Sequence, residues 1–146
     1  MTTQEEEYQA TIERTLEAVN IYIEKVKEKN GKEVICVENV LYADSDYLVY
    51  INKYLNHFLE VKCRRHKYGK FMTTKVPLRK HSTAEHFYIR NKIKTYFLCY
   101  FSDDTLCVLD LTKEPNNVSS QVARHDRGEE KDVYAFYDID RFTIIS

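Results

Sequence analysis

Apolar residues recur along the chain with two spacings, one typical of a helix and the other of strands. Between residues 6 and 29 they are separated by three and four positions, as on one face of an amphipathic helix. This stripe consists of Tyr8, Ile12, Leu16, Val19, Ile23 and Val26. Acidic residues crowd the first turns and lysines the last, and Asn30-Gly31 supplies an end. The pattern predicts one long N-terminal helix.

Shorter apolar runs predict a sheet. The expected strands are residues 32–41, 46–51, 57–63, 95–101, 106–111 and 133–139. The runs at 95–101 and 106–111 are continuously apolar, which implies burial on both faces of the sheet.

The sequence between these strands predicts one more helix and two loops. Residues 82–91 predict a helix capped by Ser82, with Glu85 at the capping-box position. Residues 66–72 form a basic loop, and residues 112–132 are polar and turn-rich, which predicts a long surface loop. Together with the strands, these elements predict an α/β domain with a central mixed sheet flanked by helices.

Length and composition narrow the class of protein. A chain of 146 residues with 43% hydrophobic residues, three Gly and two Pro suits one well-ordered domain spanning residues 1–146. We expect a cytoplasmic protein with no membrane partner, because no apolar run approaches a membrane span and the first residues lack a signal-peptide pattern. The four cysteines have no zinc-finger spacing, and we expect them to be reduced core residues.

The formal charge of -1 conceals a strong segregation of charge. Residues 61–94 carry eleven Lys and Arg but a single acid, Glu85. A basic block with interleaved aromatic residues is typical of a surface that contacts a DNA backbone, although a solvated basic surface is the alternative. The candidate contacts are Arg64, Arg65, Lys67, Tyr68, Lys70, Lys75, Arg79 and Lys80.

A carboxylate and an ammonium share one face of an apolar strand at the start of this block. Glu60 and Lys62 alternate with apolar neighbours, and a hairpin with its turn at residues 52–56 would set Asp46 opposite Lys62. Two nearby carboxylates repel unless a cation lies between them, and Mg²⁺ takes oxygen ligands of this kind. The alternative is a solvated sheet face on which Glu60 and Lys62 form a weak ion pair.

Asp46 followed by Glu60-Val61-Lys62, with an apolar strand before each, resembles the PD-(D/E)XK nuclease superfamily. The resemblance covers residues 10–111 and is strongest with small virus-encoded, Holliday-junction-resolvase-like members that have a restriction-endonuclease-like core. It implies that Asp46, Glu60 and the carbonyl of Val61 bind Mg²⁺ or Mn²⁺, and that Lys62 assists the attacking water. One departure is Ser45, which stands where many members have Pro.

Three further residues are weaker candidates for the same site. Asp44 has the same strand parity as Asp46 and competes with it as a metal ligand. Lys80 lies near the start of the second helix, where members of the resolvase-like group often supply an additional Lys. Glu17 lies off the apolar stripe of the first helix, from which some members bring a Glu to the metal. A solvated surface position is the alternative for Lys80 and Glu17.

The resulting hypothesis is a Mg²⁺-dependent endonuclease that hydrolyses duplex or branched DNA and leaves 5′-phosphate ends. A homodimer would allow one small active site per chain to cut both strands. The alternatives are a catalytically inactive DNA-binding module with a nuclease fold and a viral accessory protein that binds a host factor. Nothing in the sequence separates a DNA substrate from an RNA substrate.

Overall fold

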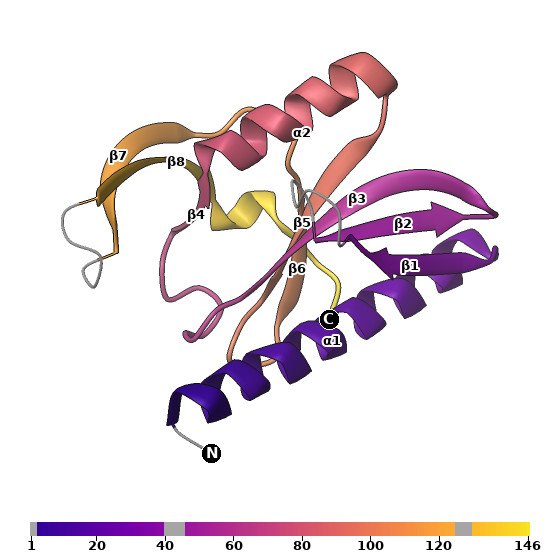
Figure 1. Ribbon diagram of the computed structural model, residues 1–146, viewed down its shortest axis with the longest axis horizontal. Helices are drawn as coiled ribbons and strands as arrows, with labels where there is room; N and C mark the ends of the chain where they lie inside the picture. Colours follow the sequence, from indigo (N-terminus) through magenta and orange to yellow (C-terminus); the bar gives the residue numbers. More distant parts are fainter. Residues whose placement is uncertain (1–2, 40–45, 125–129) are drawn as a thin grey trace.

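The fold has three layers, and the computed structural model describes residues 3–39, 46–124 and 130–146. A long helix, α1 (Thr3–Asn30), covers one face of a six-stranded sheet, and a shorter helix, α2 (Leu78–Asn91), lies over the other face (Figure 1). The large sheet consists of β1 (Val34–Glu38), β2 (Tyr47–Ile51), β3 (Tyr54–Cys63), β5 (Lys94–Tyr100), β6 (Leu106–Asp110) and β9 (Thr143–Ile144). The small sheet consists of β4 (Thr73–Pro77), β7 (Asn117–Arg124) and β8 (Glu130–Asp138).

The large sheet is mixed, as the sequence predicts. Its strand order is β1-β2-β3-β5-β6-β9, and β3 and β5 pair in parallel while the other neighbours are antiparallel. The parallel pair requires a crossover connection, which β4 and α2 supply. The α/β class with a central mixed sheet is therefore confirmed.

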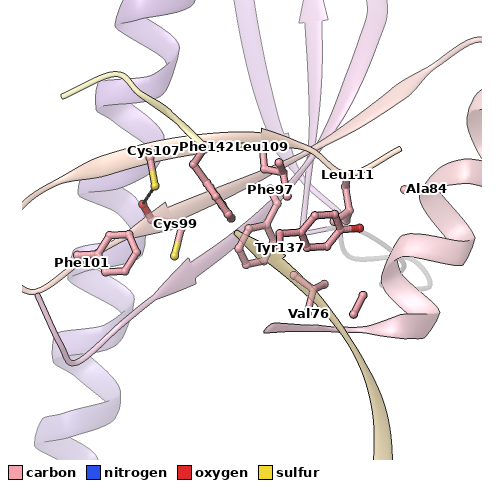
Figure 2. Packing of buried hydrophobic residues seen from close by; sticks show 11 residues of the cluster. Val76, Ala84, Phe97, Cys99, Phe101, Cys107, Leu109, Leu111, Tyr137 and Phe142 are labelled. Carbon is pink, nitrogen blue, oxygen red and sulfur yellow. Dashed lines mark hydrogen bonds between the residues drawn. The ribbon is translucent and has the colours of Figure 1, made fainter. Parts of the chain in front are cut away.

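Two separate cores hold the layers together. The α1 core contains Ala18, Val19 and Tyr22 of α1, packed on Val49, Leu59 and Leu98 of the sheet. The α2 core lies on the opposite face, where Phe97 and Cys99 of β5 meet Ala84 of α2 and Tyr137 of β8 (Figure 2). Alternation along the strands explains the division, since Leu98 points to one core and its neighbours to the other.

Helix α1 is longer than the sheet that it covers. Its 28 residues span about 42 Å at 1.5 Å per residue, whereas six strands spaced by about 4.8 Å span about 24 Å. Tyr8, near the N-terminus, is consequently 70% exposed. Leu16 is 52% exposed although its neighbours Thr15 and Glu17 contact the sheet, because the buried face is carried by Ala18, Val19 and Tyr22. The predicted helix is confirmed, but only part of its apolar stripe is buried.

Helix α2 begins at Leu78, four residues before the predicted start. Pro77 is the N-cap residue, with extended backbone angles of φ -53° and ψ 131°. Ser82 is an exposed residue inside the helix, so the predicted capping box at Ser82 is wrong. Proline favours a helix start because its fixed φ suits the entry into the first turn and it has no N–H to leave unpaired.

The segment from 112 to 132 contains strands, and its prediction as a surface loop is wrong. Strand β7 pairs with β8, and β8 pairs with β4. The sequence pattern also failed to predict strand β4. Ala135 and Tyr137 of β8 are fully buried against the large sheet. The composition of this edge strand is close to that of a loop because its side chains at residues 117–121 are exposed or half-buried on both sides.

Among the described residues, neither helix has an apolar stretch long enough to cross a lipid bilayer. All four cysteines are free thiols, and Cys99 and Cys107 are fully buried, as predicted.

Candidate active site

The β2–β3 hairpin brings Asp46 beside Glu60. Tyr47 pairs with Leu59 and Leu48 with Phe58, so the next position sets Asp46 opposite Glu60. The predicted pairing of Asp46 with Lys62 is therefore wrong by two residues. The turn is tighter than predicted, because Asn52 and Lys53 adopt positive φ angles and close it with two residues.

The two-residue error leaves the predicted face unchanged. A shift of two along a strand preserves the side to which each side chain points. A bulge between Val49 and Tyr50 absorbs part of the difference in length. Asp46, Glu60 and Lys62 therefore still share a face.

Backbone hydrogen bonds fix Asp46 at the end of β2. Its amide N donates to the Leu59 carbonyl at 3.1 Å, and its carboxylate Oδ2 accepts from the Val61 amide at 2.9 Å. The N–H and C=O of one strand residue point to the same neighbouring strand, so the Val61 carbonyl also points toward the Asp46 side. The carboxylate and this carbonyl can serve one cation.

Glu60 is buried under α2. It pairs with Phe97 of β5, whose side chain belongs to the α2 core, and it is only 7% exposed. This burial contradicts the alternative of a solvated sheet face. Burial, reinforced by repulsion from the Asp46 carboxylate, raises the pKa of Glu60 to about 7, although the Lys80 ammonium opposes the increase.

Lys80, and not Lys62, is the ion-pair partner of Glu60. Lys80 Nζ lies 3.0 Å from Glu60 Oε1, with only 20% of the Lys80 side chain exposed. This contact follows from the early start of α2, which places Lys80 in the first turn over the sheet. Pro77 is the sequence signal that could have located this start.

Lys62 remains available for a substrate on the same face. Its side chain is exposed, and it lies two residues beyond Glu60 on β3. Lys62 pairs with Cys99 of β5, a residue of the α2 core, so its side chain lies on the face that carries Glu60.

Of the other two candidate ligands, Glu17 is not brought to this pair. Glu17 Oε1 accepts a hydrogen bond from Tyr100 Oη at 2.8 Å, and Tyr100 belongs to the α1 core on the opposite face of the sheet. Asp44 lies outside the described residues.

Two of the predicted DNA contacts are engaged within the protein. Arg64 donates to the Lys75 carbonyl at 2.9 Å and so connects β3 to β4. Arg65 lies 3.7 Å from Glu7 of α1, but its side chain is 86% exposed. Arg65 is therefore accessible to a phosphate, whereas Arg64 has a structural contact.

The basic loop after β3 is anchored by its aromatic residue. Tyr68 packs edge-on against Phe101 with ring centroids 5.5 Å apart, while Lys67 and Lys70 on either side are exposed. Residues 65–70 and Ser102 line a shallow hollow. This arrangement presents ammonium groups from a fixed backbone.

Lys75 and Arg79 are exposed on β4 and in the first turn of α2. Lys75 Nζ lies 4.7 Å from the centre of the Tyr134 ring and 3.5 Å from Gln121 Oε1. The candidate DNA contacts therefore come from three neighbouring elements that surround the end of β3.

The chemistry of Asp46, Glu60 and the Val61 carbonyl fits a hard divalent cation. Two carboxylates face one ammonium, Lys80, so the group holds more negative than positive charge when Glu60 is ionised. Burial first, and then repulsion from Asp46, raises the pKa of Glu60, and an oxygen-binding cation would stabilise the ionised pair.

Comparison with known proteins agrees with this chemistry. Residues 4–144 match a family model described as "Phage putative PDDEXK endonuclease". The structure is similar to that of D212, a nuclease from a fusselovirus, with a TM-score of 0.61 over 99% of this chain and 89% of that chain. The two sequences are 12% identical, so this likeness concerns the fold alone. None of the curated protein sequences compared with the chain matches it. The match over almost the whole length shows that the chain belongs to the phage PDDEXK endonuclease family, a group of metal-dependent nucleases.

Proposed function

We propose that this nuclease is a Mg²⁺- or Mn²⁺-dependent DNA endonuclease whose metal ligands are Asp46, Glu60 and the Val61 carbonyl. The observation that carries the proposal is the buried Glu60 carboxylate beside Asp46, with its pKa raised to about 7. Two neighbouring carboxylates, one of them with a raised pKa, at the edge of a basic surface are typical of a catalytic site.

Each residue has a distinct role in this proposal. A bound Mg²⁺ or Mn²⁺ would supply Lewis-acid stabilisation of the scissile phosphate and lower the pKa of a bound water. The Lys62 ammonium orients the attacking water and donates to a phosphate oxygen as negative charge grows there. Lys80 favours the ionised form of Glu60, because its ammonium lies 3.0 Å from the carboxylate.

The exposed basic residues would bind the DNA backbone. Lys67, Lys70 and Arg65 line the hollow in the loop after β3, and Lys75 and Arg79 extend the positive surface toward α2. Contacts of this kind neutralise phosphates without reading the base sequence. Selectivity would then come from DNA shape, and a branched substrate such as a four-way junction is the form that the resolvase-like resemblance favours.

The test is cleavage of supercoiled, linear, single-stranded and four-way-junction DNA in Mg²⁺, Mn²⁺ or EDTA. Wild type is expected to cut only with metal, while Glu60→Gln, Asp46→Asn and Lys62→Ala retain DNA binding and lose at least about 100-fold in cleavage rate. Lys32→Ala is the matched control, because Lys32 is an exposed lysine outside the site. Tight binding without cleavage by the wild type would instead indicate an inactive binding module.

The Lys80→Ala variant distinguishes the role of Lys80 from that of Lys62. Loss of this ammonium removes the interaction that lowers the pKa of Glu60, so the pH at which cleavage reaches half its maximum should rise. Lys62→Ala should reduce the rate at every pH without moving the profile. An unchanged profile in Lys80→Ala would contradict the role given to Lys80.

A dimer is also proposed, so that two active sites act on the two strands. Sedimentation of the protein alone and with junction DNA measures this directly. Two chains per junction are expected, and a single chain that cuts both strands would contradict the dimer.

A further inference from the structure

A second group of ligand-type side chains lies beyond the Asp46–Glu60 pair. His81 and Glu85 are one turn apart on α2, and Glu114 follows β6. One imidazole nitrogen and one carboxylate oxygen from each Glu all lie within 4.8 Å of one another. His81 is 5% exposed, Glu85 is partly exposed and Glu114 is exposed, so the group opens to solvent on one side.

The backbone determines which nitrogen of His81 carries the proton. His81 Nδ1 lies 2.9 Å from the Leu111 carbonyl oxygen, which can only accept a hydrogen bond. Nδ1 therefore carries the hydrogen, and in the neutral imidazole Nε2 has a free lone pair. A backbone carbonyl in this position is the usual partner of a metal-binding histidine, because it fixes the ring and its tautomer.

Tyr137 also contacts the His81 ring, on the Nδ1 side. Its Oη lies 3.0 Å from His81 Nδ1 and 3.3 Å from the Lys113 carbonyl oxygen, to which it donates. These contacts hold the imidazole from behind and leave Nε2 directed at the carboxylates.

Among the described residues, neither Glu85 nor Glu114 forms an ion pair with a lysine or arginine. His81 Nε2 faces Glu85 Oε2 at 3.7 Å, which is longer than a hydrogen bond. The ring of a residue that is only 5% exposed thus turns its Nε2 edge toward two carboxylates.

We propose that His81, Glu85 and Glu114 bind a divalent transition-metal ion of the Zn²⁺ class, at a site separate from the Mg²⁺ site. An imidazole nitrogen favours Zn²⁺ over Mg²⁺, which prefers oxygen ligands alone. Ligand atoms about 2.1 Å from a tetrahedral Zn²⁺ are roughly 3.4 Å apart, and the His81–Glu85 separation of 3.7 Å is close to this value. Glu114 is exposed and can close the remaining distance.

The site would fasten α2 to the segment after β6. His81 and Glu85 belong to the helix, whereas Glu114 and the Leu111 carbonyl belong to the other side of the α2 core. Bound Zn²⁺ should therefore raise the thermal midpoint of unfolding, by an amount that grows with the logarithm of the ratio of free Zn²⁺ to its dissociation constant.

The experiment uses the full chain with Asp46→Asn and Glu60→Gln, which removes the proposed Mg²⁺ site. Zn²⁺ is titrated calorimetrically, and Co²⁺ is used as a probe whose visible absorption reports coordination. One equivalent per chain is expected. Glu85→Gln and Glu114→Gln should each weaken Zn²⁺ binding by at least about 100-fold. Loss of a residue that only supports a metal ligand already weakens binding by about 10- to 100-fold, and loss of a ligand itself should cost more. Glu28→Gln is the matched control, because Glu28 is an exposed Glu on α1.

A third variant addresses the buried histidine. The amide nitrogen of Asn can replace Nδ1 in the bond to Leu111 while removing Nε2, so His81→Asn should remain folded and lose Zn²⁺ binding. If this variant does not fold, the two exposed Glu variants decide. Failure of the Asp46→Asn, Glu60→Gln protein to bind Zn²⁺, or unchanged affinity after both Glu85→Gln and Glu114→Gln, would overturn the proposal. Neither result bears on cleavage at Asp46 and Glu60.

Discussion

Replacing Glu60 by Gln should stabilise the metal-free protein, and the gain should depend on pH. The pKa of Glu60 is raised from 4.5 to about 7 in the folded chain. Below pH 4.5 the carboxyl group is neutral in both the folded and the unfolded chain, so it does not lower the free energy of unfolding. As pH rises through this range, the unfolded chain loses its proton first, so the free energy of unfolding of the wild type falls until Glu60 ionises in the folded state.

The size of the effect follows from the shift in pKa. Each unit corresponds to about 1.36 kcal/mol, so a rise from 4.5 to about 7 amounts to about 3 kcal/mol at pH 8. The group is only 7% exposed, so solvent screens little of this cost. Gln does not titrate and can occupy the same space beside Asp46 and Lys80.

Urea denaturation in EDTA measures the difference directly. Glu60→Gln should exceed the wild type by about 3 kcal/mol at pH 8 and by close to zero at pH 4.5. Glu13→Gln, at an exposed position on α1, should show little difference at either pH. Addition of Mg²⁺ at pH 8 should stabilise the wild type and not Glu60→Gln, because only the wild type has both carboxylates.

A difference that is the same at both pH values would refute this reasoning. It would mean that the gain comes from packing of the amide and not from the ionisation of Glu60. A variant less stable than the wild type at pH 8 would show that the Lys80–Glu60 ion pair outweighs the cost of burial.

Three further outcomes are expected. Lys53→Gly should raise the free energy of unfolding by about 1 kcal/mol in urea denaturation, because Lys53 holds a φ of +72° that glycine adopts without strain. A lower free energy of unfolding in this variant would show that the turn is unstrained. Tyr137→Phe should lower it by about 1 kcal/mol, since the hydroxyl bonded to His81 is lost while the ring stays packed, and calorimetric melting checks this. Lys70→Ala should reduce the slope of log affinity for DNA against log salt by about 1, with Lys32→Ala unchanged, and an unchanged slope in Lys70→Ala would exclude a phosphate contact.

The sequence was sufficient to predict the main elements of the large sheet. Long periodic or continuously apolar segments predicted α1, β5 and β6 correctly, because burial along a whole face leaves a regular pattern. The same patterns failed for β4 and β7, where polar side chains on solvated positions hide the alternation. Those strands form only through pairing with β8, which is a contact between segments far apart in the chain.

For the active site, the sequence determined which residue types share a face and the tertiary structure decided which of them touch. Parity alone puts Glu60 and Lys62 on one side, because side chains alternate along a strand. Asp46 shares this side because its pairing differs from the predicted one by two residues, whereas a shift of one would have turned it to the other face. The pairing of Asp46 with Glu60, the contact of Lys80 with Glu60 and the removal of Glu17 to the opposite face depend on the turn length, the start of α2 and the position of α1. Pro77 is a local signal for the start of α2, but the contacts themselves form only when segments separated along the chain pack together. The burial that raises the pKa of Glu60 is likewise a property of the folded layers, and it is what makes this common Glu-x-Lys pattern a candidate catalytic site.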